Sequence, residues 1–547
     1  MSRLSSSFQM EYGCPSTERS RGSSKSMSGS SKFTEYSNDR KRAGIYVWSA
    51  VVGLVSGLIV VAYRMTILFL ETKRRVALSF VTHPVVNIVI WLCAAGAMGL
   101  VTAIMLKSSP HINGSGIPQV KAFLMRRIRF DWKKELPFKF IGGSLALGAG
   151  LSLGREGPSI QLGALTGAAL TELTGKHEYQ RYLVTAGAAA GISAAFNAPL
   201  AGVLFCIEEL HRSVSPVMLT SSLIASFSAN VVMWAFFGHA PIFGISLANV
   251  LPVEMYIVTI PLIGVASALV GTIFSRGIVW TQSMYRRVVP SEMLRLVSAF
   301  VVAAGVCLVV PALNGGGHPL VESLIHTERG PWLVAALIAG KLVFTLFSYG
   351  SGAPGGIFLP LLAIGALIGA LCAFPFNELG LPEQYLPNYI LLGMAGFFTA
   401  VVRAPITGAV LITEMAGSFA HFPAFILVAV VASLGSGILR NKPIYDILLA
   451  KLAPDRHDGA HPSPVTLYIP VFEGSVLEKC STVVDKLPEG CILVAVERGE
   501  SELFPDKDID IHPGDVLQVV VDRNKAHRYK ERLLELARAP SGNIEAN

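Results

Sequence analysis

The chain has 547 residues, of which 52% are hydrophobic and only 15% are charged, and its formal net charge is +8. Soluble proteins typically carry about 25% charged residues, so this composition excludes an ordinary soluble protein and indicates a polytopic membrane protein. The positive charge is concentrated in segments that flank apolar stretches, which favours a role in membrane topology over nucleic-acid binding.

The first 43 residues are rich in serine and contain eight basic and four acidic side chains. They lack the apolar core that a signal peptide needs. We therefore expect residues 1–43 to form a disordered tail, on the cytoplasmic side by the positive-inside rule. The loop of residues 121–139 carries a second basic cluster and is expected on the same side.

Apolar stretches recur through residues 44–449, and the longer ones approach the roughly 20 residues that a helix needs to cross a bilayer. The seven cysteines include no C-x-x-C pair, so neither a disulfide framework nor a zinc site is indicated. No pattern of Cys, His or Gly implies a metal or an organic cofactor.

The apolar region contains an internal repeat. GREGPSIQLGALTGA (154–168) aligns without gaps on GIFLPLLAIGALIGA (356–370), and NAPLAGVLFCIEE (197–209) aligns on RAPITGAVLITEM (403–415). Two similar halves with Gly/Pro-interrupted apolar segments are typical of transporters built from inverted repeats. A binding site between the two halves is therefore predicted.

Three segments have the composition of helix starts inside the membrane: GSGIP (114–118), GREGP (154–158) and GGIFLP (355–360). The first N–H groups of a helix are free and carry a partial positive charge, which suits an anion. Proline is tolerated in a first helical turn, and glycine permits a close approach to the backbone. Taken singly, each segment is better explained as an ordinary kink or tight turn of a membrane helix, where Gly and Pro are frequent.

Together with KPIYDILL (442–449), these segments resemble the CLC family of chloride channels and proton/chloride antiporters, over about residues 44–450. The resemblance implies an all-α membrane domain of two inverted repeats with broken helices over residues 44–449. It also implies a homodimer with one ion path per subunit, in the inner membrane of a bacterium. The expected substrates are chloride and protons.

The resemblance implies an anion site formed by the hydroxyl groups of Ser115 and Tyr445 and the backbone N–H groups of Ile357 and Phe358. Such donors bind chloride without a full positive charge that would trap it. A serine rather than a proline at position 115 favours chloride over nitrate. Without the family resemblance, a helix-capping serine and an interfacial tyrosine would be the simpler interpretations.

Glu156 corresponds to the family's gating glutamate, whose carboxylate competes with the anion when ionised and swings away when protonated. Arg155, Gly154 and Gly157 are expected to support it. A plain Arg–Glu pair is the alternative, although adjacent residues on a helix face different directions.

Glu209 matches the internal proton-transfer residue of the family's exchangers, and Glu208 could line its water path. The sequence therefore predicts chloride/proton exchange. The alternative is a passive chloride channel of the same fold, gated through Glu156 and regulated by the cytoplasmic domain. A solvated pair of carboxylates at a helix end is the simplest interpretation of Glu208 and Glu209.

An enzyme is not indicated. An intramembrane serine hydrolase would need a base beside Ser115, and GSGIP lacks the full G-x-S-x-G elbow.

After residue 449 the composition changes to a charged linker, residues 450–465. Residues 466–540 contain three short strand patterns and a final amphipathic helix pattern, which predicts a small α+β domain. This segment resembles the TrkA-C ligand-binding domain, so we expect a cytoplasmic C-terminus that could bind a small ligand.

Overall fold

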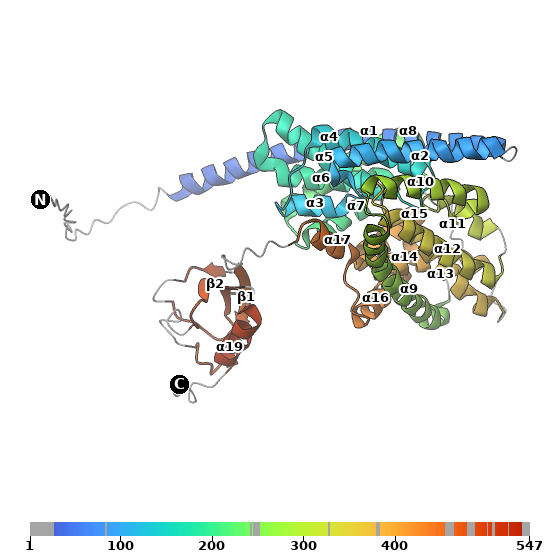
Figure 1. Ribbon diagram of the computed structural model, residues 1–547. Coiled ribbons are helices and arrows are strands. Elements are labelled where there is room, and N and C mark those ends of the chain that lie inside the picture. The colour runs from blue at the N-terminus through green and yellow to red at the C-terminus, as the bar shows by residue number, and fades with distance from the viewer. Residues whose placement is uncertain are drawn as a thin grey trace, which may run out of the picture. The chain divides into compact units, whose positions relative to one another are not determined.

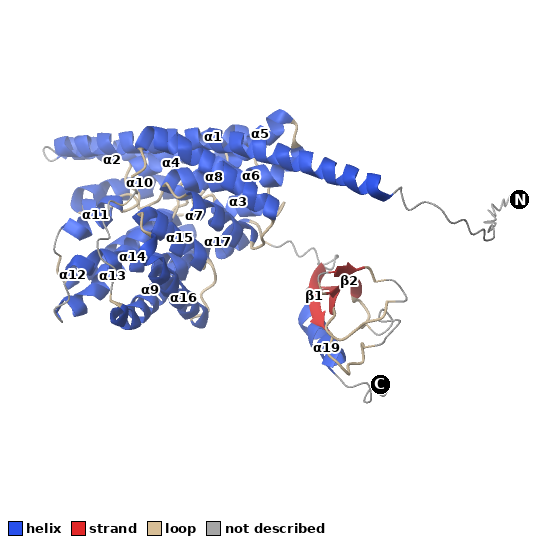
Figure 2. Cartoon of the chain, turned by 180° about the vertical axis from the view of Figure 1, so that it is seen from behind, coloured by secondary structure: helices blue, strands red, loops and turns tan. Residues whose placement is uncertain are grey.

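The computed structural model describes residues 27–81, 85–240, 243, 252–326, 329–378, 383–454, 464–478, 487–499, 501–505, 509–522 and 525–538. Two compact units are present, Met1–Pro454 and Asp455–Asn547. In the described residues the first unit is helical, and the strands belong to the second (Figure 2).

The first unit begins with a half that ends near residue 237. Its helices are α1 (Met27–Val81), α2 (Val85–Ser108), α3 (Ile117–Leu124), α4 (Trp132–Gly148), α5 (Glu156–Thr174), α6 (Gln180–Phe196), α7 (Pro199–Phe205) and α8 (Pro216–Phe237). A π-helical turn, Cys206–His211, continues α7. Helix α1 starts at Met27, so it includes part of the segment expected to be a disordered tail; residues 1–26 lie outside the described residues.

The second half repeats this order (Figure 1). Its helices are α9 (Val253–Val288), α10 (Glu292–Val309), α11 (His318–His326), α12 (Pro331–Gly350), α13 (Phe358–Glu378), α14 (Leu386–Val402), α15 (Pro405–Ala416) and α16 (Phe422–Ile438), and α17 (Ile444–Leu452) follows them. Among the described residues, eight helices are long and apolar enough to cross a membrane. The predicted all-α polytopic fold is confirmed.

Equivalent helices of the two halves pack in the same way. Helix α5 packs on α6, and α13 packs on α14. At both contacts glycines face each other, Gly163 with Gly187 and Gly365 with Gly393, and a methyl group on any of them would overlap the facing backbone. Small residues allow such close helix packing where water provides no hydrophobic driving force.

A two-fold relationship between the halves is visible in reciprocal contacts between equivalent residues. Gly154 and Gly356 form an isolated antiparallel bridge, in which each N–H donates to the carbonyl oxygen of the other at 2.7 Å. The first-repeat motif GREGP therefore meets its second-repeat counterpart directly. The two copies of the repeated sequence motif are therefore in direct contact in the fold.

Glu208 and Glu414, also equivalent, make a second reciprocal contact. Glu208 accepts hydrogen bonds from the backbone N–H groups of Ile406 and Thr407, at 3.3 and 2.8 Å, at the start of α15. Glu414 accepts two from the start of α7, at 3.0 and 2.7 Å. A carboxylate satisfies free N–H groups there and interacts favourably with the helix dipole.

Two buried lysines occupy equivalent positions in the two repeats and make equivalent hydrogen bonds. Lys139 on α4 donates from Nζ to the carbonyl oxygens of Ile112 and Gly114, at 2.8 and 2.7 Å. Lys341 on α12 makes the equivalent pair of bonds in the second repeat, at 2.8 and 2.6 Å. Each lysine therefore holds the loop that leads into a short helix, α3 in the first repeat and α11 in the second.

The second unit contains an antiparallel sheet in the order β1-β4-β2-β3. Its elements are β1 (Pro464–Pro470), β2 (Ile492–Arg498), β3 (Ser501–Leu503), β4 (Val516–Asp522) and α19 (Ala526–Arg538). The three predicted strands and the final helix are present, and β3 is an additional short strand. Alternate residues of β4 are buried in the core of this unit.

In the second unit an ion pair joins Arg498 of β2 to Asp515, the residue before β4. Arg498 donates from Nε and Nη2 to the two carboxylate oxygens of Asp515, at 2.9 and 2.8 Å. The Asp515 side chain is 2% exposed. The hydrogen bond from the Arg498 guanidinium holds the pKa of Asp515 below its usual value.

Candidate functional site

The three predicted helix-start motifs meet at one place. The backbone N–H of Gly355 donates to the carbonyl oxygen of Gly114 at 3.0 Å, so the loop before α13 is bonded to the loop before α3. A methyl group added to Gly157 would lie 2.7 Å from the carbonyl oxygen of Ser115 and 3.1 Å from Cα of Gly356. Glycine is therefore needed at position 157 for the three backbones to converge.

Each of the three helices begins beside this junction. Gly116 precedes α3 in the left-handed region, with φ of 89°, and Pro118 occupies the first turn. Helix α5 begins at Glu156 and α13 at Phe358. Their first turns contain Pro158 and Pro360, as the sequence predicted. The positive ends of three helix dipoles are consequently brought together in the interior.

Glu156 lies at this junction and is fully buried. Within the described residues, neither of its carboxylate oxygens accepts a hydrogen bond of normal geometry. The backbone N–H groups of Glu156 and Leu359 face the carboxylate, and Nε of Arg155 lies 3.8 Å from Oε1. A buried carboxylate without full hydrogen bonding is costly, so the local positive potential is what makes it tolerable.

The four predicted anion donors are buried around the same junction. Ser115 is 1% exposed, and Ile357, Phe358 and Tyr445 are 0 to 1% exposed. The Phe205 ring joins two of them, with its centroid 6.0 Å from the ring of Phe358 and 6.3 Å from that of Tyr445. The Tyr445 hydroxyl has no hydrogen-bond partner among the described residues, so it is free to donate to a ligand.

Electrostatic interactions link this junction to the predicted internal proton site. Tyr445 lies close enough to interact with Glu156, Glu209 and Tyr349. The Tyr349 hydroxyl in turn lies beside Ser115. The two predicted carboxylates, Glu156 and Glu209, therefore both interact electrostatically with one buried tyrosine.

Glu209 and Lys121 form the buried end of a network of charges. Its carboxylate accepts a hydrogen bond from Nζ of Lys121 at 2.8 Å, and both side chains are 2% exposed. Lys121 also donates to Asp446 at 2.7 Å, and the other carboxylate oxygen of Asp446 pairs with Arg212 at 2.5 Å. Two cations and two anions are thus paired, and the buried members, Lys121 and Glu209, are paired with each other as burial of charge requires.

The adjacent carboxylates Glu208 and Glu209 have separate environments. Glu209 faces Lys121 on α3, whereas Glu208 points to the start of α15 and also accepts a hydrogen bond from the Thr407 hydroxyl. A π-helical turn at Cys206–His211 gives the two neighbours these different directions.

Sequence reasoning missed Lys121, Asp446 and Arg212. Lys121 is three residues after the end of GSGIP, and Asp446 is inside KPIYDILL, so both were within or near recognised motifs. Their pairing was not readable, because Lys121 is 88 residues from Glu209 and 325 residues from Asp446 along the chain. Within the described part of the chain, no group of three or more His, Cys, Asp or Glu side chains could hold a metal ion.

The fold and the junction define a class of membrane protein. Two helical repeats paired about a two-fold relationship, with broken helices whose N-termini converge at their interface, are the architecture of inverted-repeat transport proteins. Residues 98–437 match the family model described as voltage gated chloride channel, and residues 480–534 match the TrkA-C domain. The chain therefore belongs to the voltage-gated chloride channel, or CLC, family and carries a TrkA-C domain.

Curated relatives match most of the chain. The H(+)/Cl(-) exchange transporter ClcA of Salmonella paratyphi A is 34% identical over 433 residues, which cover 76% of this chain and 89% of that protein. Its counterpart from Salmonella typhi is 33% identical over 432 residues, with the same coverage.

Solved structures share the fold. The crystal structure of a slow cyanobacterial Cl-/H+ antiporter matches with a TM-score of 0.71 and 28% identity, covering 76% of this chain and 99% of that one. A CLC-type fluoride/proton antiporter matches with a TM-score of 0.63 and 22% identity, over 72% of this chain and 96% of that one.

Proposed function

We propose that this protein exchanges chloride for protons across the membrane. The observation that carries the proposal is the environment of Glu156, a buried carboxylate without a normal hydrogen-bond partner at the point where three helix N-termini converge. A site arranged to attract an anion holds a group that is an anion only when deprotonated. The ionised carboxylate and chloride therefore compete for this site, and protonation of Glu156 favours chloride binding.

In the proposed cycle, the ionised Glu156 carboxylate occupies the positive potential that would otherwise attract chloride. Protonation makes the side chain neutral, so it gives up this position and chloride enters. Ser115, Tyr445 and the backbone N–H groups of Ile357 and Phe358 hold the dehydrated anion by hydrogen bonds alone. Release stays fast because no full cation contacts the ion.

Glu209 is proposed to pass protons between the cytoplasm and Glu156. The electrostatic interaction of both Glu209 and Glu156 with the Tyr445 side chain supports this role, because it indicates that the two carboxylates lie near the same group. Lys121 fixes the orientation of Glu209 through the 2.8 Å hydrogen bond. We propose that Lys121 is a positioning residue for the internal proton carrier.

The remaining parts of the proposal concern assembly and topology. A homodimer with one ion path in each subunit is proposed from the family. Cytoplasmic termini are proposed from the basic segments of residues 1–43 and 121–139, and a bacterial inner-membrane location is proposed from the family. The TrkA-C unit is proposed to bind a small cytoplasmic ligand.

A passive chloride channel of the same fold is the second candidate, and one observation favours it. Glu209 is held by Lys121 in a buried ion pair, which fixes the carboxylate in place and restricts its movement toward Glu156. In that case Glu156 would gate chloride flow, and no proton would accompany the ion.

The two candidates differ in a measurement on the purified protein in liposomes. A chloride gradient is imposed with no pH gradient, and proton movement is followed with a pH-sensitive dye while a chloride electrode follows the anion. Exchange predicts protons pumped against their own gradient until the two driving forces balance. Chloride flux without proton pumping would make the protein a channel.

A further inference from the structure

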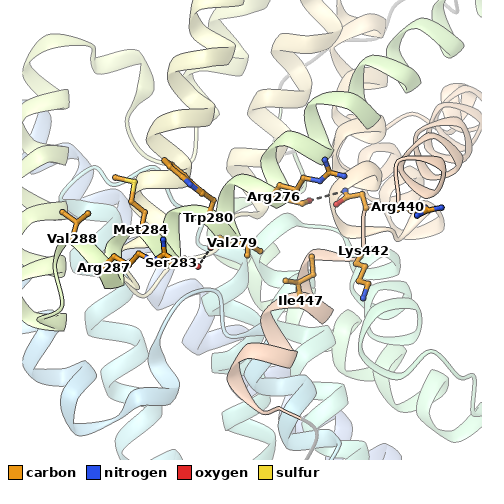
Figure 3. A pocket seen from close by; sticks show the side chains of 12 residues that line it. Arg276, Val279, Trp280, Ser283, Met284, Arg287, Val288, Arg440, Lys442 and Ile447 are labelled. Atoms are coloured by element: carbon orange, nitrogen blue, oxygen red, sulfur yellow. Dashed lines mark hydrogen bonds between the residues drawn. The ribbon is translucent and has the colours of Figure 1, made fainter. Parts of the chain in front are cut away.

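A basic cavity lies on the side of α9 near its C-terminal end, where it meets the connection between α16 and α17 (Figure 3). Its volume is about 830 Å³. Helix α9 supplies one wall, and residues 440–442 and Ile447 of α17 supply the other. The cavity is separate from the buried junction that holds Glu156.

The lining carries a strong excess of positive charge. Four cationic residues line the cavity, and the lining includes no Asp or Glu; the four are Arg276, Arg287, Arg440 and Lys442. Arg276 donates to the carbonyl oxygen of Leu439 at 3.3 Å, which fixes its guanidinium at the cavity wall. Within the described chain, Arg287, Arg440 and Lys442 form no ion pair. The cavity therefore attracts an anion.

Beside the cations, the same wall of α9 is apolar and exposed. Trp280, Met284 and Val288 are 65, 43 and 68% exposed, and they follow one another at helical spacing. Exposed apolar residues on a membrane-spanning helix contact lipid chains, and a tryptophan near the helix end is typical of the interface with water. Figure 3 shows these three side chains on the same helix as Arg287 and Arg276.

We propose that this cavity binds one anionic phospholipid, with its phosphate among the four cations and an acyl chain along Trp280 and Met284. Charge complementarity selects the anionic headgroup, and the exposed apolar wall selects a lipid over a soluble phosphate compound. Arg286 and Arg287 in the last turn of α9 place this end on the cytoplasmic side by the positive-inside rule. Basic pockets between membrane helices on that side are suited to anionic headgroups.

The cavity is physically connected to the helix that carries Tyr445. Ile447 lines the cavity from α17, two residues beyond Tyr445. Asn441, also in the lining, is anchored by hydrogen bonds to the Ser275 hydroxyl and the Ala400 carbonyl oxygen, at 3.3 and 3.2 Å. A lipid held here would contact the segment that positions Tyr445, so lipid binding is expected to influence chloride affinity.

The binding test uses the full chain in phosphatidylcholine vesicles containing a small fraction of phosphatidylglycerol with brominated acyl chains. Bromine quenches tryptophan fluorescence on contact, and the difference between the wild type and Trp280→Phe isolates the Trp280 signal. We expect quenching to saturate at a low fraction of brominated phosphatidylglycerol. Brominated phosphatidylcholine at the same fraction should quench several-fold less.

Charge variants decide whether the four cations are responsible. Arg440→Gln and Lys442→Gln should each weaken the preference for phosphatidylglycerol by about fivefold. Arg287→Gln tests the other wall, and it keeps the proposal testable if changes near α17 disturb folding. Arg286→Gln removes the same charge from the same turn outside the cavity, and should leave the preference unchanged.

Three results would overturn the proposal. Equal quenching by the two brominated lipids in the wild type would mean that only bulk lipid contacts Trp280. An equal loss of preference in Arg286→Gln would mean a general surface charge effect. Displacement of the brominated phosphatidylglycerol by millimolar inorganic phosphate would identify a soluble anion site instead. Because the readout is lipid binding, its failure is distinguishable from a failure of the proposed exchange.

Discussion

The two repeats of the membrane unit share a framework and differ at the residues that carry the proposed chemistry. Equivalent pairs with matching roles are Gly154 with Gly356 and Glu208 with Glu414. Each pair bonds reciprocally across the repeat interface. These residues hold the two halves together, and a change in either member should weaken the same interface.

Other equivalent positions carry different side chains. Glu156 stands where the second repeat has Phe358, and Glu209 stands where it has Met415. All four side chains are buried, so the two repeats place a carboxylate and an apolar group in matching positions. The symmetric positions thus form the scaffold, whereas the proposed ion-dependent chemistry depends on positions where the two repeats differ.

The largest effect is expected at Glu156. Glu156→Gln keeps the shape of the side chain and removes its charge and its exchangeable acid. Proton transport should therefore be lost entirely, while chloride still crosses. Proton flux and chloride flux are measured in the same liposome preparation. If this variant still pumps protons, the carboxylate that distinguishes Glu156 from Phe358 is not required for proton transport.

A smaller effect is expected at Lys121. Lys121→Met removes a hydrogen bond to a charged group, which is worth about 1.5 to 3 kcal/mol, so proton transport should slow by about tenfold or more. Lys121→Arg keeps the charge and should restore much of the rate. If Lys121→Met transports protons at the wild-type rate, the ion pair with Glu209 has no positioning role.

Glu208 and Glu414, which cap the starts of α15 and α7, should affect stability without affecting the coupling of proton to chloride transport. Glu208→Gln and Glu414→Gln each weaken a charged helix cap, at a cost of about 1 kcal/mol. The unfolding temperature of the purified protein should fall by a few degrees, by similar amounts in the two variants. Clearly different changes in unfolding temperature would contradict an equivalent capping role for the two residues. A changed proton/chloride transport ratio in Glu208→Gln would place Glu208 in the proton path.

The smallest effect is expected for the pH dependence of the stability of the TrkA-C unit, through Asp515. Because the pKa of Asp515 is lowered in the folded state, its contribution to stability is present above about pH 4, the ordinary range of an Asp. The contribution is lost as the pH falls through the lowered value. Since Arg498 is partly exposed, we expect about 1 kcal/mol or less.

Hydrogen exchange of β2 and β4 in the full chain tests this expectation. Asp515→Asn should reduce protection at pH 6 and should reduce it much less near pH 3, after correction for the intrinsic exchange rate. An equal loss at the two pH values would show that the ion pair does not carry the effect.

Much of the fold was readable from the sequence because its signals are local. Apolar stretches, the repeated GAL-x-GA motif and the Gly/Pro-rich starts of α3, α5 and α13 each depend on neighbouring residues. The strands of the second unit were recognisable from turn residues and alternation. Helix α1 is longer than expected, since the Ser-rich composition before residue 44 did not indicate a helix from Met27.

The candidate site was only partly readable, because its contacts join distant segments. The motif residues Ser115, Glu156 and Tyr445 were named from their motifs, but the Lys121 network joins α3, α17 and the turn after α7. The cap role of Glu208 likewise depends on the second repeat, since its partners lie in α15. Such pairings follow from tertiary packing, which the sequence alone does not specify.

The central claim is tested most directly by comparing Glu209→Gln with Glu208→Gln in the chloride-gradient liposome experiment. The two variants remove neighbouring charges, one in the Lys121 network and one in the reciprocal cap. We expect Glu209→Gln to lose proton pumping while chloride still moves, and folded Glu208→Gln to keep the wild-type proton/chloride ratio. Normal pumping by Glu209→Gln, or a loss of pumping in Glu208→Gln alone, would rule out Glu209 as the internal proton carrier.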